Sequence, residues 1–144
     1  MSEIHALLVE DDNSLRECLS ELLELSGIMT DDVNCAMACY QALNTKRYDI
    51  AIIDEGLPDQ SGLRIVEFLN ENTNIGIILL TASDSVTDRI EGYNKGADHF
   101  FVKPIRSAEL AAAIKSLNAR LLKNTTQIKS DIINALPFCL GISA

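Results

Sequence analysis

Five short apolar runs, none longer than six residues, alternate along this chain with longer amphipathic stretches. The runs cover residues 4–9, 28–33, 49–53, 75–80 and 99–102. Such runs are typical of buried strands, and their alternation with helical stretches indicates repeated strand–helix–strand units around a parallel sheet. A length of 144 residues with 47% hydrophobic content fits one globular core. The sequence therefore predicts one α/β core.

The stretches between and after the runs predict five helices. Their expected ranges are 14–25, 35–45, 62–70, 86–95 and 108–122. The first stretch is amphipathic, because one helical face gathers the side chains of Leu15, Leu19, Leu22 and Leu23. Gly27 follows this stretch as a common helix terminator. We expect these helices to cover both faces of the sheet.

The end of the chain is longer than five strand–helix units require. One further helical face is formed there by Ile128, Ile132 and Leu136. Pro137 and Gly141 are expected to end that helix. We therefore expect a folded domain over residues 1–122 and a C-terminal extension or linker over residues 123–144.

Four of the five runs give way to a polar residue of a different kind. Glu10 and Asp11 follow the first run, Asp54 the third, Thr81 the fourth and Lys103 the fifth. Because the carboxyl ends of parallel strands lie along one edge of an open sheet, these side chains are expected to meet there. An acidic pair, a lone aspartate, a hydroxyl and a lysine suit a site that holds a divalent cation and transfers a phosphoryl group to a carboxylate.

Four motifs carry a family resemblance: LLVEDD, IIDEGLPDQSG, LLTAS and GADHFFVKP, in this order. They resemble the receiver domain of bacterial two-component response regulators, of the OmpR/PhoB-like type that is joined to a winged-helix DNA-binding output. The resemblance covers about residues 4–122, and four ordered motifs are far more specific than any one alone. It implies a flavodoxin-like (CheY-like) fold, a doubly wound five-stranded parallel sheet of order 2-1-3-4-5 with five helices.

The resemblance also implies a magnesium site. Glu10 and Asp11 match the acidic pair that holds Mg²⁺ in this family. Mg²⁺ prefers hard oxygen ligands in octahedral geometry and retains waters. The Asp11 and Asp54 carboxylates, the Gly56 carbonyl and a water held by Glu10 would suit it.

The remaining roles concern phosphorylation and its readout. By resemblance, a histidine kinase phosphorylates Asp54, Thr81 is the switch hydroxyl, and Lys103 contacts the transferring oxygens. Phe100 occupies the position where the family has its switch aromatic, although periodicity alone favours a core role for it. We expect phosphorylation to reshape the surface formed by the fourth helix, fifth strand and fifth helix, and so to control an output, in particular transcription. Such a receiver is not an enzyme in its own right, although it assists its own Mg²⁺-dependent phosphorylation and dephosphorylation.

The chain departs from the family pattern in ways that carry expectations of their own. His99 stands where a second aspartate is common, and Ala113 stands where the ELLAR motif has its arginine, so the usual charged dimer seam is incomplete. A homodimer is therefore left open. Gly56 and Ser83, two positions past the aspartate and the threonine, offer little to orient an attacking water. We predict a long-lived phosphoryl group.

Two other classes of function share part of this pattern. A haloacid-dehalogenase-like phosphatase also uses a strand-end aspartate with Mg²⁺, but it needs a second aspartate as general acid where this chain has Gly56. The other alternative is a protein-interaction module with a receiver fold that is not phosphorylated. The presence of every residue that the chemistry needs argues against it, and the tail can be a linker to a DNA-binding output domain or an extension that docks on a partner protein.

Composition excludes other classes. The net charge of −9, without any basic stripe, argues against nucleic-acid binding by this chain alone. No apolar stretch approaches the ~20 residues of a membrane span, and the acidic start is unlike a secretory signal. The four cysteines show no paired framework. We expect a cytoplasmic protein with no membrane partner.

Overall fold

The computed structural model describes the backbone of residues 3–141 and the side chains of residues 3–124. Five parallel strands form one sheet in the order β2-β1-β3-β4-β5. The strands are β1 (Ile4–Val9), β2 (Ile28–Val33), β3 (Ile50–Asp54), β4 (Gly76–Thr81) and β5 (His99–Val102). The predicted doubly wound, flavodoxin-like sheet is confirmed.

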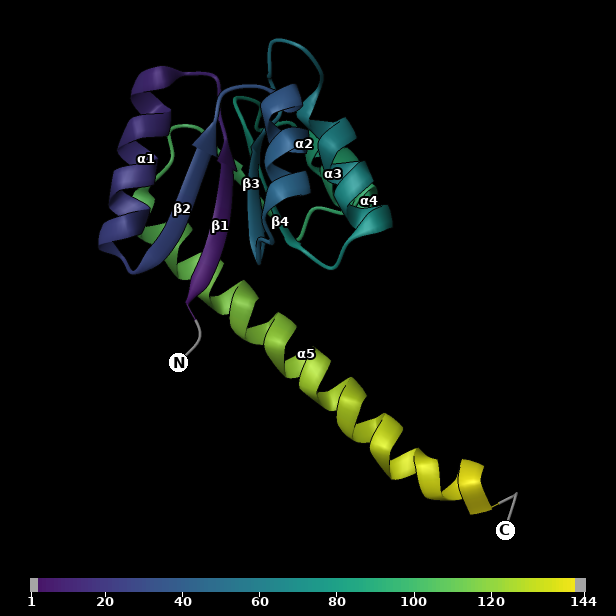
Figure 1. Cartoon of the computed structure of the whole chain (residues 1–144). Helices are drawn as coiled ribbons and strands as arrows, with labels where there is room; N and C mark the ends of the chain where they lie inside the picture. Colours follow the sequence, from purple (N-terminus) through teal and green to yellow (C-terminus); the bar gives the residue numbers. More distant parts are fainter. Residues whose placement is uncertain (1–2, 142–144) are drawn as a thin grey trace.

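Helices cover both faces of this sheet, as Figure 1 shows. One face is covered by α1 and α5, and the other by α2, α3 and α4. The helices are α1 (Asn13–Leu25), α2 (Ala36–Thr45), α3 (Gly62–Asn72), α4 (Val86–Lys95) and α5 (Ser107–Gly141). The five helices and their order along the chain match the prediction.

The sheet has two cores because successive side chains of a strand point to opposite faces. In β1, Leu7 packs on the α2–α3 side and Leu8 on the α1–α5 side, and both are fully buried. The same alternation continues through β3 and β4, whose residues are all buried. Central strands that are covered on both faces are expected to be apolar throughout, which explains why the runs were recognisable in the sequence.

Two strands end later than the sequence predicted. Asp54 and Thr81 are the last residues of β3 and β4, whereas the apolar runs ended one residue earlier. The reason is that both residues still occupy ladder positions, Asp54 opposite Leu80 and Thr81 opposite Val102. The sheet itself therefore holds the backbone of both residues.

Helix α5 is much longer than expected. The predicted end near Leu122 is wrong, since the helix runs for 35 residues to Gly141. The chain has no glycine or proline between positions 118 and 136, so nothing local ends the helix there. Pro137 lies within the helix and does not end it.

The second half of α5 extends away from the α/β body (Figure 1). The side chains of the face predicted at Ile128, Ile132 and Leu136 lie outside those that the structure describes. Within the described part of the chain, no helix is both long enough and apolar enough to cross a membrane.

Candidate functional site

The polar residues predicted at the strand ends meet at the carboxyl edge of the sheet. A cleft of about 570 Å³ opens there between the loops that follow β1, β3, β4 and β5. Six of the seven predicted site residues line it: Glu10, Asp11, Asp54, Gly56, Thr81 and Lys103. The seventh, Phe100, lies outside the lining.

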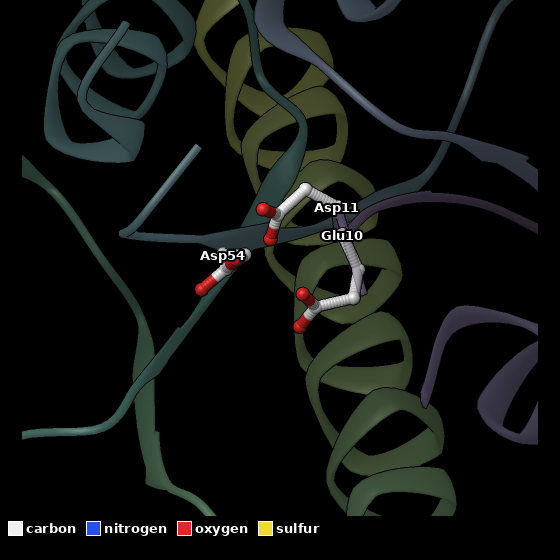
Figure 2. Close-up of side chains that lie close together, drawn as sticks. All are labelled: Glu10, Asp11 and Asp54. Carbon is white, nitrogen blue, oxygen red and sulfur yellow. The ribbon is translucent and has the colours of Figure 1, made fainter. Parts of the chain in front are cut away.

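Three carboxylates gather in this cleft, as Figure 2 shows for Glu10, Asp11 and Asp54. One oxygen from each lies within 4.8 Å of the others. Glu10 is fully buried and Asp54 is 4% exposed, whereas Asp11 is exposed. Acidic groups packed this closely away from water repel one another and lose hydration, so they require a compensating cation.

Lys103 supplies part of that compensation. Its Nζ lies 2.8 Å from Glu10 Oε1 and 3.2 Å from Asp54 Oδ1. Burial raises the pKa of Glu10, and Asp54 raises it further, although Lys103 and the Asp12 N–H oppose the change. Burial would lower the pKa of Lys103, but its bonds to the two carboxylates outweigh that effect and raise it. One lysine facing three acids leaves the site with an excess of negative charge.

One buried oxygen of Glu10 has an unused acceptor position. Oε2 accepts the Asp12 backbone N–H at 3.1 Å. Oε1 has only the ion-pair contact with Lys103 and accepts no directed hydrogen bond from any described residue. Because a carboxylate oxygen has two lone pairs, Oε1 can keep its contact with Lys103 and also accept a water that a metal ion carries. The three carboxylates therefore fit a divalent cation.

The loop after β3 holds Asp54 in place. The Gly56 N–H donates to Asp54 Oδ1 at 3.2 Å. At Gly62 a Cβ atom would clash with the backbone of Asp54 and Glu55, so only glycine permits this close approach. Asp59 accepts the N–H groups of Ala36 and Met37 at the start of α2, at 2.9 and 3.0 Å. Hydrogen bonds thus hold the loop both at Asp54 and at the start of α2.

Lys103 is placed by the end of β5. Its backbone N–H donates to the Thr81 carbonyl oxygen at 2.7 Å, and a cis peptide bond joins it to Pro104. The ladder between β4 and β5 therefore extends up to the lysine. Its side chain reaches across the sheet to Glu10, directly after β1, and to Asp54, the last residue of β3.

Thr81 has a partner that the sequence did not indicate. Its hydroxyl donates to Glu55 Oε2 at 2.6 Å, and the Thr81 hydroxyl oxygen accepts the Ser83 N–H at 3.1 Å. Ser83 in turn donates from its own hydroxyl to Asp88 at 2.6 Å. The available signal for Glu55 was its position directly after Asp54, but sequence alone does not say where its side chain turns.

Phe100 lies in β5 beneath α4 and is half-buried. Its ring centroid is 6.2 Å from that of Tyr93, and the Arg89 guanidinium lies 5.6 Å from the ring centroid. A Cβ at Gly92 would approach the ring to 3.3 Å, so the absence of a side chain there makes room for it. The ring thus packs against the sheet core and also contacts the outer helix.

Comparison with known proteins agrees with this architecture. The family model described as response regulator receiver domain matches residues 6–115. The transcriptional regulatory protein BasR of Escherichia coli K12 is 34% identical over 128 residues, which cover 88% of this chain and 56% of BasR. The transcriptional regulatory protein PhoP of the same strain is 32% identical over 141 residues, covering 97% of this chain and 61% of PhoP.

A solved structure supports the same assignment. The receiver domain of Francisella response regulator 1452 superposes with a TM-score of 0.78 at 28% identity, covering 82% of this chain and 98% of that one. The chain spans less than two thirds of the length of BasR and PhoP. Both relatives are named as transcriptional regulators, in agreement with the predicted OmpR/PhoB-like type. The chain belongs to the response regulator receiver domain family.

Proposed function

We propose that this receiver accepts a phosphoryl group on Asp54 from a histidine kinase and thereby controls an output. The observation that carries the proposal is the unbalanced cleft, in which a nearly buried Asp54 lies 3.2 Å from Lys103 and shares its surroundings with two further carboxylates. Such a site has little use as a structural element, because its charges destabilise the fold without a bound cation.

A magnesium ion fits the donors present. The Asp11 and Asp54 carboxylates and the Gly56 carbonyl would bind it, and Glu10 Oε1, which also contacts Lys103, would hold one of its waters. When bound, Mg²⁺ offsets the repulsion between the Asp54 carboxylate and an incoming phosphoryl group. The protein's own part is to keep the carboxylates in place through the sheet ladder and the Gly56 N–H.

The transfer itself is a displacement at phosphorus. A carboxylate oxygen of Asp54 forms the new P–O bond while the bond from phosphorus to the donor's imidazole nitrogen breaks, and the imidazole leaves with that electron pair. Lys103 Nζ, which contacts Asp54 Oδ1, is positioned to neutralise charge on the phosphoryl oxygens. In this step the receiver is a phosphoacceptor that assists its own modification and is not a turnover enzyme.

The readout uses the surface of α4, β5 and α5. We infer that the Thr81 hydroxyl moves toward the phosphoryl group and that Phe100 turns inward in response. Support comes from the packing of Phe100 between the sheet and the exposed helix α4, whose outer residues Val86, Ile90 and Tyr93 are 68%, 54% and 47% exposed. Partners that prefer one packing would then sense phosphorylation as a population shift.

The output lies beyond the receiver. We propose that residues 1–122 form the receiver and that residues 123–144 are a C-terminal extension or a linker. The continuous helix α5 supports a helical connection to a partner protein or to a DNA-binding output domain, as expected from relatives that are longer than this chain. A homodimer through the α4–β5–α5 surface stays open.

Intact mass spectrometry tests the proposal. The protein is incubated with Mg²⁺ and acetyl phosphate, beside an Asp54→Asn variant whose fold is checked by circular dichroism. We expect one phosphoryl adduct on the wild-type protein and none on the variant or after Mg²⁺ removal. A folded wild-type protein that binds Mg²⁺ yet forms no adduct would favour the alternative, an interaction module with a receiver fold.

A further inference from the structure

The Thr81 hydroxyl is already committed to a partner at the edge of the cleft. It has a single proton, which it donates to Glu55 Oε2 at 2.6 Å. Its oxygen also accepts the Ser83 N–H at 3.1 Å, so both bonds fix the direction of the hydroxyl. A hydrogen bond from a hydroxyl to a carboxylate is charge-assisted and stronger than one between neutral groups. In this arrangement Thr81 cannot donate to any group at Asp54.

The backbone of Glu55 is fixed beside Thr81, so Glu55 can bond to the Thr81 hydroxyl but cannot move with it. Its backbone N–H donates to the Leu80 carbonyl at 2.8 Å, and its carbonyl accepts the Gly62 N–H at 2.9 Å. The backbone is therefore fixed from both sides, and only the side chain can rotate. Because Glu55 is partly exposed, water can take over its hydrogen bond once Thr81 leaves.

Other acids at the same cleft are engaged elsewhere. Asp88 accepts the Ser83 hydroxyl at 2.6 Å, and Asp12 accepts the Leu15 N–H at 3.0 Å as the cap of α1. Among the described cleft carboxylates, Glu55 is the acceptor of the Thr81 proton. A change at Asp12 thus alters the charge of the cleft without touching Thr81.

We propose that Glu55 is a positioning residue that holds the Thr81 hydroxyl in its unphosphorylated orientation and competes with the phosphoryl group for the Thr81 proton. The inference rests on the proposed function, because the competing acceptor is a phosphoryl oxygen on Asp54. It adds a residue that sets how readily the switch responds. Weakening the Glu55 acceptor favours the phosphorylated state, and removing the Thr81 hydroxyl abolishes that advantage.

A double-mutant cycle tests the coupling between the two side chains. The dissociation constant of beryllofluoride, a phosphoryl mimic, is measured by calorimetry at saturating Mg²⁺ for wild type, Glu55→Gln, Thr81→Ala and the double variant. Glutamine keeps the size of the side chain but removes its charge. We expect Glu55→Gln to tighten binding about 5-fold when Thr81 is present, from the loss of charge assistance.

The control for charge alone is Asp12→Asn, which keeps a capping side chain on α1. In the Thr81→Ala background, Glu55→Gln should tighten binding no more than Asp12→Asn does in wild type. Thr81→Ser, which retains a hydroxyl, should restore the larger effect, and Thr81→Val, which has none, replaces Thr81→Ala if that variant fails to fold. Equal tightening with and without the hydroxyl would overturn the inference alone. Wild-type protein that does not bind beryllofluoride would overturn the proposed function and the inference together.

Discussion

Both ends of the sheet carry a cavity, but among the side chains of residues 3–124 the excess of buried negative charge lies at the carboxyl end. The cavity at the amino ends of β3 and β4 is the larger, about 870 Å³ against about 570 Å³ for the carboxyl-end cleft. Near it, Asp31 accepts the Tyr48 hydroxyl at 2.7 Å and the Lys46 ammonium at 3.0 Å. Size alone would select the amino end as the functional site, whereas charge balance selects the carboxyl end, where we propose that phosphorylation occurs.

The pKa values of carboxyl groups also shift in opposite directions at the two ends. The hydrogen bonds from Tyr48 and Lys46 lower the pKa of Asp31. Burial raises the pKa of Glu10 despite the nearby Lys103. A satisfied carboxylate stabilises the fold by being charged, while a crowded and buried one costs stability until a cation arrives. The following variants compare the two ends directly.

The largest expected effect concerns metal affinity. We predict that Asp11→Asn weakens Mg²⁺ binding by about 10- to 100-fold, because it removes a charged oxygen from the acidic cluster. Asp31→Asn, the matched change beside the other cavity, should leave the affinity within about 2-fold, since screening is strong over that separation. Isothermal titration calorimetry measures both. Equal losses in the two variants would mean that general charge, and not the cleft, binds the ion.

The next effect concerns the two lysines. Lys103→Met should lower the free energy of unfolding by about 2 kcal/mol without metal, because it leaves two buried carboxylates without a positive partner. The loss should be smaller than for a fully enclosed ion pair. Lys46→Met breaks an exposed pair, with side chains 63% and 43% exposed, and should cost below about 1 kcal/mol. Urea unfolding followed by circular dichroism gives both values. A greater loss for Lys46→Met would reverse the contrast between the two ends.

A smaller effect concerns phosphoryl lifetime. The long-lived phosphoryl group expected for this chain is attributed to Gly56 and Ser83, and Gly56 has open space around its Cβ direction. Gly56→Asn should therefore fold normally and place an amide near the site that orients water. We predict that the acyl-phosphate half-life shortens by about 10-fold. Loss of the adduct over time, followed by intact mass, measures it, and an unchanged half-life would remove Gly56 from the explanation.

The smallest effect is a pH dependence of opposite sign at the two ends. The pKa of Glu10 is raised in the folded state, so the protonated form is favoured there, and this contribution to stability is lost as pH rises through the folded pKa. The pKa of Asp31 is lowered, so its contribution is present above its unfolded value and is lost as pH falls through the folded one.

Two variants measure this difference. Relative to wild type, metal-free Glu10→Gln should become more stable as pH rises from about 4 to 7. Relative to wild type, Asp31→Asn should become less stable as pH rises from about 3 to 5, because the folded pKa of Asp31 lies below its unfolded value of about 3.9. Thermal unfolding at a series of pH values records both trends. Trends of the same sign would contradict the opposite charge balance of the two ends.

The position of the site could be read from the sequence because it depends on topology. Once the runs are assigned to parallel strands, Asp54, Thr81 and Lys103 must share one edge of the sheet, whatever the details of packing. Their exact place in the strands was shifted by one residue, since a polar residue can continue a ladder that an apolar run does not reveal. Strand ends of this kind can be located only when the backbone pairing is known.

Other features depend on contacts that no local pattern encodes. The bond between Glu55 and Thr81 joins residues 26 positions apart and follows from how β3 and β4 align. The length of α5 was underestimated because, among the residues whose side chains the structure describes, its packing against the sheet core extends only to Leu121, while its backbone continues. An apolar helical face indicates how far a helix packs on the core, but only a terminator indicates where the helix ends.

The most direct test of the account is to locate the phosphoryl group. After incubation with Mg²⁺ and acetyl phosphate, peptide mapping by tandem mass spectrometry identifies the modified residue. The account predicts a single acid-stable, base-labile acyl phosphate on Asp54, with none on Asp31 or on other acids. Modification of a different residue, or spread over several surface acids, would contradict the claim that the carboxyl-end cleft is the phosphoacceptor site.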